Sequence, residues 1–218
     1  MSLEKENMFL RSNTNRQERI VWFDIETTGF NIFHNEIIEL SAIDNLGNSF
    51  SSLISITKGL PKKITEITNI TFEMLKGQPS EQEVLTRFVK FLNGDVVPNL
   101  DYTVRPMRSM KKTKWLIGHN ILAFDIPFIK AQCQKHNIDF PETKLIDTMR
   151  MAQFILPEKY SYALGALCEI FALQSAGAHR AMNDVLATQA IYNSLCTLYR
   201  HTYDKCSPQF ICELTTIQ

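Results

Sequence analysis

The stretch that decides the fold is Val21-Trp22-Phe23-Asp24-Ile25-Glu26-Thr27-Thr28-Gly29-Phe30. Its apolar run predicts a buried strand, which ends in two carboxylates before the chain turns at the Thr-Thr-Gly sequence. Because side chains at i and i+2 point to the same face of a strand, Asp24 and Glu26 should be neighbours, with Cα atoms roughly 6–7 Å apart. Two acids there repel each other unless a cation lies between them. The alternative is a strand that ends in solvent with two unrelated surface acids.

The composition is that of an ordinary globular protein, and 218 residues are enough for one domain with an ample core. Lys+Arg and Asp+Glu are both 23, so the formal net charge is zero. A nucleic-acid partner would therefore need a local groove or bound cations, since the protein has no global positive field. The five cysteines form an odd set without C-x-x-C spacing, which argues against a disulfide framework and for a reducing compartment.

No apolar stretch approaches the ~18 residues of a membrane span, and the N-terminus lacks the apolar region of a signal peptide. The sequence therefore predicts a soluble intracellular protein, in the cytoplasm or nucleus, with no membrane partner.

Periodicity and turn residues divide the chain into alternating strands and helices. Three early strands are predicted over 19–26, 36–43 and 49–56, joined by short turns as in an antiparallel meander. A fourth strand is expected over 115–120, ending in the polar pair His119-Asn120. Helices are expected from Ser80, from Asp125, over 147–155, over 160–171, and from just after His179 to about residue 200.

One domain is expected over residues 18–202, with a disordered polar leader at 1–17 and an unassigned tail at 203–218. The segment 93–114 breaks the pattern and carries five Lys or Arg against two Asp, 5 − 2 = +3. Long loops of this kind are functional or disordered. A solvated insertion and a loop that contacts a polyanion both remain open.

Four acids at the ends of elements could form one constellation: Asp24, Glu26, Asp125 and Asp184. Gathered together, they would hold two hard divalent cations through oxygen ligands. Two such metals, about 4 Å apart, can clamp the attacking and leaving oxygens of a phosphodiester. Taken singly, Asp125 could be an N-terminal helix acid on the dipole and Asp184 a solvated helix position.

His179 lies five residues before Asp184, about 140° around a helix, so the two would not share a helical face. We therefore place His179 on the loop before the helix, where it can approach the attacking water. Its ordinary pKa near 6.5 suits a general base. The alternative is a surface histidine. His119 is interpreted as a core or turn histidine.

Three motifs, in order, resemble those of the DnaQ-like 3′–5′ exonucleases: Asp24-Ile25-Glu26-Thr27-Thr28-Gly29, Asn120-Ile121-Leu122-Ala123-Phe124-Asp125 and His179-Arg180-Ala181-Met182-Asn183-Asp184. The third, His-x-x-x-x-Asp, is typical of the branch with a catalytic histidine (DEDDh). The resemblance covers roughly residues 19–200, and it is specific because all three motifs occur together.

The resemblance implies an α/β fold of the RNase H-like type, with a central mixed five-stranded sheet flanked by helices. It implies that Asp24, Glu26, Asp125 and Asp184 bind two Mg²⁺, with Mn²⁺ as substitute, and that His179 deprotonates the attacking water. It also implies a pocket for the 3′-terminal nucleotide, formed by the backbone of Thr27, Thr28 and Gly29, by Phe30 packed on the terminal bases, and by Asn120 and Phe124.

The function expected from this resemblance is metal-dependent 3′–5′ exonuclease activity on nucleic-acid 3′ ends, with single-stranded DNA favoured over RNA. The product would be a nucleoside 5′-monophosphate. An RNA-trimming exoribonuclease and a non-catalytic binding module on the same fold remain alternatives. Proofreading would need a polymerase or repair partner in trans, and a homodimer is compatible with the family.

Overall fold

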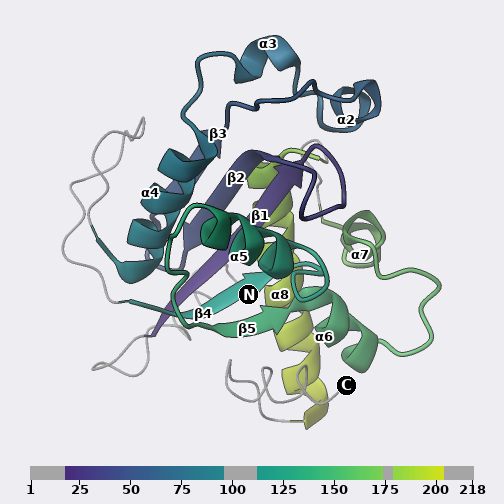
Figure 1. Ribbon diagram of the computed structural model, residues 1–218. Helices are drawn as coiled ribbons and strands as arrows, with labels where there is room; N and C mark the ends of the chain where they lie inside the picture. The colour runs from purple at the N-terminus through teal and green to yellow at the C-terminus, as the bar shows by residue number, and fades with distance from the viewer. Residues whose placement is uncertain (1–17, 96–111, 174–178, 204–218) are drawn as a thin grey trace.

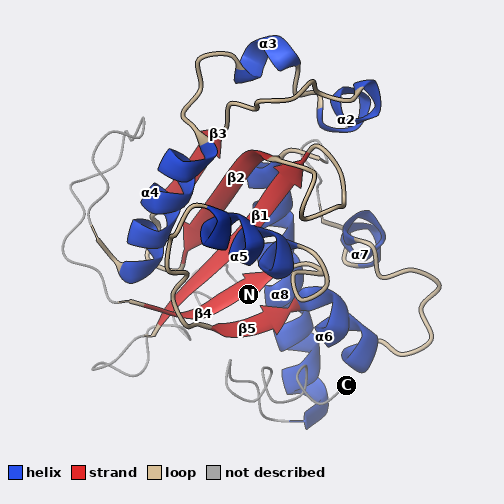
Figure 2. Cartoon of the chain, viewed as in Figure 1, coloured by secondary structure: helices blue, strands red, loops and turns tan. Residues whose placement is uncertain are grey.

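The centre of the computed structural model is a five-stranded sheet in the order β3-β2-β1-β4-β5 (Figure 2). The structure describes residues 18–95, 112–173 and 179–203. The antiparallel part comprises β1 (Arg19–Thr27), β2 (Ile37–Asp44) and β3 (Ser49–Leu53). On the other side of β1, β4 (Thr113–Gly118) and β5 (Lys144–Asp147) run parallel to it. The predicted mixed sheet is therefore confirmed.

Helices cover both faces of the sheet (Figure 1). One face packs against α4 (Glu81–Asn93) and α5 (Asp125–Lys135). The opposite face packs against α6 (Thr148–Ile155), α7 (Leu164–Ile170) and α8 (Ala181–Tyr203). Two short helices, α2 (Lys62–Thr68) and α3 (Phe72–Leu75), form a small satellite cluster with Ile38.

The central strand β1 is buried on both faces, and its alternation assigns each side chain to one of the two cores. Val21, Phe23 and Ile25 belong to the core with α4 and α5. Ile20 and Trp22 belong to the core with α8. Asp24 and Glu26 continue the second series, so the strand presents them on the α8 side of the sheet.

Several predicted boundaries were wrong. The strand expected over 49–56 ends at Leu53. The chain then leaves the sheet, because the Ser55 N–H donates to Pro79 O (3.0 Å) and not to a neighbouring strand. The helix expected over 160–171 is confined to α7, because the Tyr162 hydroxyl donates to Leu156 O (2.7 Å) and closes a loop before it.

The helix expected over 147–155 begins one residue later, because Asp147 is its N-cap and accepts from Met149 N–H at 3.0 Å. The strand β5 and the helix α2 were not assigned from the sequence. The predicted leader, the tail and most of the 93–114 insertion lie outside the described residues.

Cys133, Cys168 and Cys196 are buried and take part in no disulfide within the described residues. Burial raises the pKa of Cys133 to about 12, as expected for an inert core thiol. Across the described ranges, no helix combines the length and apolar character needed to cross a membrane.

A fully buried ion pair closes the end of the sheet where β1 begins. Arg19 Nε donates to Asp44 Oδ2 at 2.8 Å, and both side chains are 0% exposed. Arg19 also donates to Phe91 O (2.6 Å) and Thr113 Oγ1 (3.1 Å), so one guanidinium ties β1 to β2, α4 and β4. A buried charge with so many partners is costly to leave unpaired.

We expect Asp44→Asn to lower the free energy of unfolding by roughly 3–5 kcal/mol, because it strands the buried charge of Arg19. Urea denaturation of the purified variant measures this. The double variant Arg19→Met/Asp44→Asn should recover much of the loss, and Glu66→Gln in the exposed Lys62–Glu66 pair should change little. Equal losses in the single and double variants would contradict this account.

Candidate active site

Asp24 and Glu26 are both half-buried near the end of β1, with β2 directly beside them. Burial raises the pKa of Asp24 well above its usual range, and the charges of Asp125, Glu26, Asp184 and Glu39 raise it further. The pKa of Glu26 is raised to about 8, first by burial and then by Asp184, Glu39 and Asp125. The two acids therefore lie in one carboxylate cluster that is costly to ionise.

Asp125 is the first residue of α5 and reaches the same cluster from the end of β4. Its Oδ1 accepts from Ile25 N–H at 3.3 Å, which joins α5 to β1 between the two acids. The side chain is buried, and burial raises its pKa to about 7, although hydrogen bonds from Ile25 and from its own N–H oppose the shift.

The turn between β4 and α5 sets the position of Asp125. At Gly118 a Cβ would lie 2.0 Å from Ile121 Cγ2, so the turn closes only because this residue is glycine. Asn120 has a left-handed backbone (φ 60°), which asparagine tolerates well. Buried Asp147 accepts from Asn120 N–H (3.0 Å) and Leu122 N–H (3.1 Å) and so holds the turn to the end of β5.

His119, immediately before this turn, bonds through Nδ1 with Thr148 Oγ1 at 2.9 Å, and burial lowers its pKa. It lies at the turn, as expected.

His179 and Asp184 come from the start of α8. His179 lies on the loop before the helix, as predicted from its spacing, with φ 65° and an exposed side chain. Its N–H donates to Asp184 Oδ2 at 3.2 Å, which ties the loop to the first turn of the helix. Burial raises the pKa of Asp184, against the opposing charge and hydrogen bond of His179.

These residues converge. Potential ligand atoms of Glu26, His179 and Asp184 all lie within 4.8 Å of one another. Asp24 and Asp125 adjoin this group: the charges of Glu26 and Asp184 raise the pKa of Asp24, and the charge of Asp125 raises the pKa of Glu26. The donors are carboxylate oxygens and an imidazole, a set suited to a hard divalent cation that would offset their mutual repulsion. These residues fit a divalent cation, while the assignment of Asp24, Glu26, Asp125 and Asp184 as its four ligands stays a prediction.

The loop after β1 is tightly held from within. Thr27 Oγ1 donates to Gly29 O (2.8 Å), and Thr28 Oγ1 accepts from Glu36 N–H (3.0 Å). A Cβ on Gly29 would lie 2.9 Å from the Asn35 side-chain amide, so a larger residue would displace that side chain. The two threonine hydroxyls are thus used inside the loop, which leaves its backbone as the surface that a ligand could meet.

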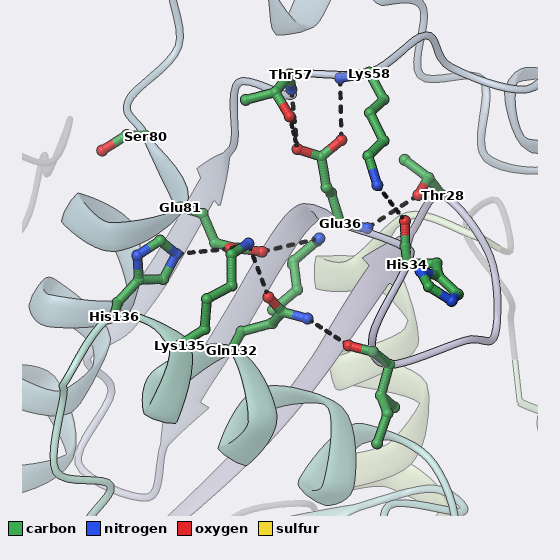
Figure 3. A network of polar contacts seen from close by, with 12 residues as sticks. Thr28, His34, Glu36, Thr57, Lys58, Ser80, Glu81, Gln132, Lys135 and His136 are labelled. Atoms are coloured by element: carbon green, nitrogen blue, oxygen red, sulfur yellow. Dashed lines mark hydrogen bonds and ion pairs between the residues drawn. The ribbon is translucent and has the colours of Figure 1, made fainter.

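A polar network braces the same loop from outside (Figure 3). From α5, Gln132 Nε2 donates to Ile32 O (2.8 Å), and Lys58 Nζ donates to His34 O (3.0 Å). Glu81 joins the two long helices of this face by accepting from Lys135 Nζ at 2.9 Å and bonding His136 Nε2 at 2.8 Å. The loop is therefore fixed at its middle as well as at its ends.

This braced loop displays aromatic rings to solvent. Phe30 is 89% exposed and meets the Phe124 ring edge-on, with centroids 5.8 Å apart. Phe33, which the sequence analysis did not single out, is 81% exposed. Its sequence signal is weak, because one aromatic residue in a loop has no periodic context.

The sequence analysis also missed Glu39 and Arg180. Arg180 Nη2 donates to Glu39 Oε1 at 2.8 Å, directly beside the carboxylate cluster. A glutamate between apolar residues of a buried strand was a usable signal, but its partner is 141 positions away in the chain.

A hollow of about 670 Å³ lies elsewhere, where β4 and β5 begin, and is lined by Lys112, Lys114, Lys130 and Lys144 among others. None of the predicted site residues lines it. The carboxylate cluster therefore lies outside this hollow.

Comparison with known proteins identifies the family. The family model described as "Exonuclease" (RNase_T) matches residues 21–104 and 98–192. The chain is 33% identical over 172 residues to the PolC-type DNA polymerase III of Halalkalibacterium halodurans, covering 77% of this chain but only 11% of that polymerase. It is 28% identical to the DNA polymerase III subunit epsilon of Aquifex aeolicus, covering 79% of this chain and 77% of the subunit.

Exonucleases are among the solved structures with the same fold. E. coli Exonuclease I in complex with a dT13 oligonucleotide superimposes with a TM-score of 0.69 at 18% identity, covering 86% of this chain and 43% of that one. Exonuclease X in complex with 5′ overhanging duplex DNA gives a TM-score of 0.63 at 18% identity, covering 90% of this chain and 99% of that one. The protein belongs to the RNase_T exonuclease family and has the RNase H-like fold of the DnaQ-like exonucleases.

Proposed function

We propose that this chain is a 3′–5′ exonuclease that releases nucleoside 5′-monophosphates from single-stranded DNA. The observation that carries the proposal is the convergence of Glu26, His179 and Asp184 within 4.8 Å, with Asp24 and Asp125 adjoining them. Exonucleases of this family depend on divalent metal ions, and this donor set suits such ions.

Asp24, Glu26, Asp125 and Asp184 would hold two Mg²⁺, with Mn²⁺ as substitute. When bound, the metals supply positive charge that stabilises the attacking and leaving oxygens. The protein's own contribution is the rigid placement of the four carboxylates on β1, α5 and α8.

His179 is the general base in this proposal. Its side chain is exposed while its backbone is tied to Asp184, so the imidazole is positioned yet accessible to water. It accepts a proton from the water that attacks the terminal phosphorus. The bond between phosphorus and the 3′ oxygen of the penultimate nucleotide breaks, and the last nucleotide leaves with a 5′ phosphate. The 3′ oxygen takes up a proton from solvent and remains as the 3′ hydroxyl of the shortened strand.

The braced loop after β1 is the proposed seat of the 3′-terminal nucleotide. Backbone groups of Thr27, Thr28 and Gly29 would face the nucleotide, while Phe30 and Phe124 offer rings on which bases can stack regardless of sequence. Asn120 supports the pocket through the turn before α5. DNA is favoured because the relatives named above are DNA polymerases and the structural neighbours hold DNA. The same relatives suggest a polymerase partner in trans.

The direct test uses matched single strands of DNA and RNA, labelled at either end, with Mg²⁺, Mn²⁺ or EDTA. We expect stepwise loss from the 3′ end, abolished by EDTA and faster on DNA. Asp184→Asn should remain folded and lose the activity, since it removes a metal ligand. Faster loss of RNA would make the enzyme an exoribonuclease. No cleavage by a folded protein, or full activity in Asp184→Asn, would refute the proposal.

His179→Ala should slow single-turnover cleavage by about 10²–10⁴-fold, the range for a lost general base. Rates at saturating metal across pH 6–9 measure this. His119→Gln provides a control histidine outside the cluster, and it should cleave at close to the wild-type rate. A rate for His179→Ala equal to wild type across this range would remove the residue from the mechanism.

Metal-free protein should lose stability as pH rises. A carboxyl whose folded-state pKa is raised binds its proton more tightly when folded, so its stabilisation is present at low pH and lost as pH rises through the folded pKa. With Glu26 at about 8 and Asp125 at about 7, the loss should fall between about pH 4 and pH 8.

Thermal unfolding in EDTA at pH 5.5 and 8.5 checks this. Mg²⁺ should raise Tm more at pH 8.5, and Glu26→Gln should flatten the profile. A metal-free Tm that rises steadily to pH 8.5 would contradict the expected effect of carboxylate crowding.

A further inference from the structure

The site contains a fifth carboxylate, Glu39, which lies opposite Glu26 in the register of β1 and β2. Its side chain is 4% exposed, and its charge raises the pKa values of Glu26, Asp24 and Asp184. An uncompensated fifth acid here would add to the repulsion and compete for any bound cation. The effect of Glu39 on the site therefore depends on which groups bind its two carboxylate oxygens.

Both oxygens of Glu39 are engaged by the start of α8. Arg180 Nη2 donates to Oε1 at 2.8 Å, and Arg180 Nε lies 3.2 Å from each oxygen. The backbone N–H of Ala181 donates to Oε2 at 3.0 Å. This forked, charge-assisted arrangement fixes the geometry of both groups.

Arg180 also starts α8 through its backbone. Its carbonyl accepts from Asn183 N–H (2.8 Å) and Asp184 N–H (3.1 Å). His179 directly precedes it, and Asp184 lies in the first turn after it. Any displacement of Arg180 therefore moves both residues relative to Glu26.

The charge of Arg180 reaches the cluster as well. It lowers the pKa of Glu26, in opposition to the effect of Glu39. The hydrogen bond with Glu39 in turn raises the pKa of Arg180, which therefore stays charged. Its guanidinium is thus held at Glu39 by a partner of opposite charge, beside acids that would otherwise attract it.

We propose that Glu39 and Arg180 act together as positioning residues: Arg180 withholds the Glu39 carboxylate from the metal site, and Glu39 withholds the Arg180 cation from Glu26 and Asp184. The pair thereby fixes the start of α8, and with it His179 and Asp184. The catalytic part of this proposal rests on the proposed exonuclease function, whereas the part about cation binding does not.

Two hypotheses, a pair that only stabilises the fold and a pair that positions the site, predict different Mn²⁺ affinities for the single variants. If the pair only stabilised the fold, removing either partner would weaken Mn²⁺ binding in step with lost stability. In the proposed arrangement the two removals have opposite effects. Arg180→Gln frees an acid beside Glu26 and should tighten Mn²⁺ binding, whereas Glu39→Gln frees a cation and should weaken it.

The experiment measures Mn²⁺ binding to the full chain without nucleic acid, from the free-ion signal in electron paramagnetic resonance. We expect about tenfold tighter binding for Arg180→Gln and about tenfold weaker binding for Glu39→Gln. The double variant should return close to wild type. Glu83→Gln/Arg87→Gln removes a Glu–Arg pair of α4 outside the site and should leave Mn²⁺ affinity unchanged.

Kinetics at saturating Mn²⁺ test the positioning role. Both single variants should lower kcat at least tenfold, with KM for a single-stranded oligonucleotide within about threefold of wild type. Arg180→Lys keeps the charge without the fork, so it should bind Mn²⁺ nearly as wild type does while kcat still falls. This variant also serves if Arg180→Gln does not fold.

Shifts in Mn²⁺ affinity of the same sign in both single variants would overturn the proposal, as would full kcat in Arg180→Lys. A rise in KM alone would make Arg180 a substrate contact and overturn it too. Failure of the exonuclease proposal can be told apart from failure of this one. In that case the wild-type protein would degrade no nucleic acid, whereas Mn²⁺ affinity shifts of opposite sign in the two single variants would still support the role of the pair.

Discussion

The structure depends on the alternation of one central strand. Every second side chain of β1 enters the core with α4 and α5, and the others face α8. Since the strand is buried on both faces, it cannot slip by one residue without exchanging the two sets. The alternation that places Ile20 and Trp22 in the core with α8 also places Asp24 and Glu26 on that face of the sheet. The strand register that packs the two cores therefore also fixes the position of the two acids.

The remaining site residues are brought to this strand by three local devices. Gly118 and the left-handed Asn120 shape the turn that places Asp125 against β1. Asp147 holds that turn through two backbone N–H groups. The Glu39–Arg180 contact fixes the start of α8. The acids stay crowded because surrounding packing and hydrogen bonds maintain the arrangement, although their raised pKa values show the electrostatic cost.

The residues of the candidate site differ in how firmly the surrounding structure holds them. The carboxylates sit on a central strand and two helices, and the loop after β1 is braced from α5 and by Lys58. His179 is the exception, with an exposed side chain on a short loop tied by one backbone hydrogen bond to Asp184. This difference agrees with the proposed roles, because metal ligands benefit from rigid placement and a general base needs access to the attacking water.

The sequence by itself determined the fold class, the three motifs, the five candidate catalytic residues and the position of His179 before its helix. The helix and strand pattern, the grouping of the acids and the position of His179 follow from local periodicity and spacing. The fold class and the catalytic roles follow from the resemblance of the three motifs to those of the DnaQ-like exonucleases, and motifs of this kind can be read without folding the chain. Only the tertiary structure decided that Glu39 faces Glu26, that Arg180 neutralises it, and that Tyr162 shortens α7. Those outcomes depend on strand register and on contacts between distant positions, and local pattern carries no information about either.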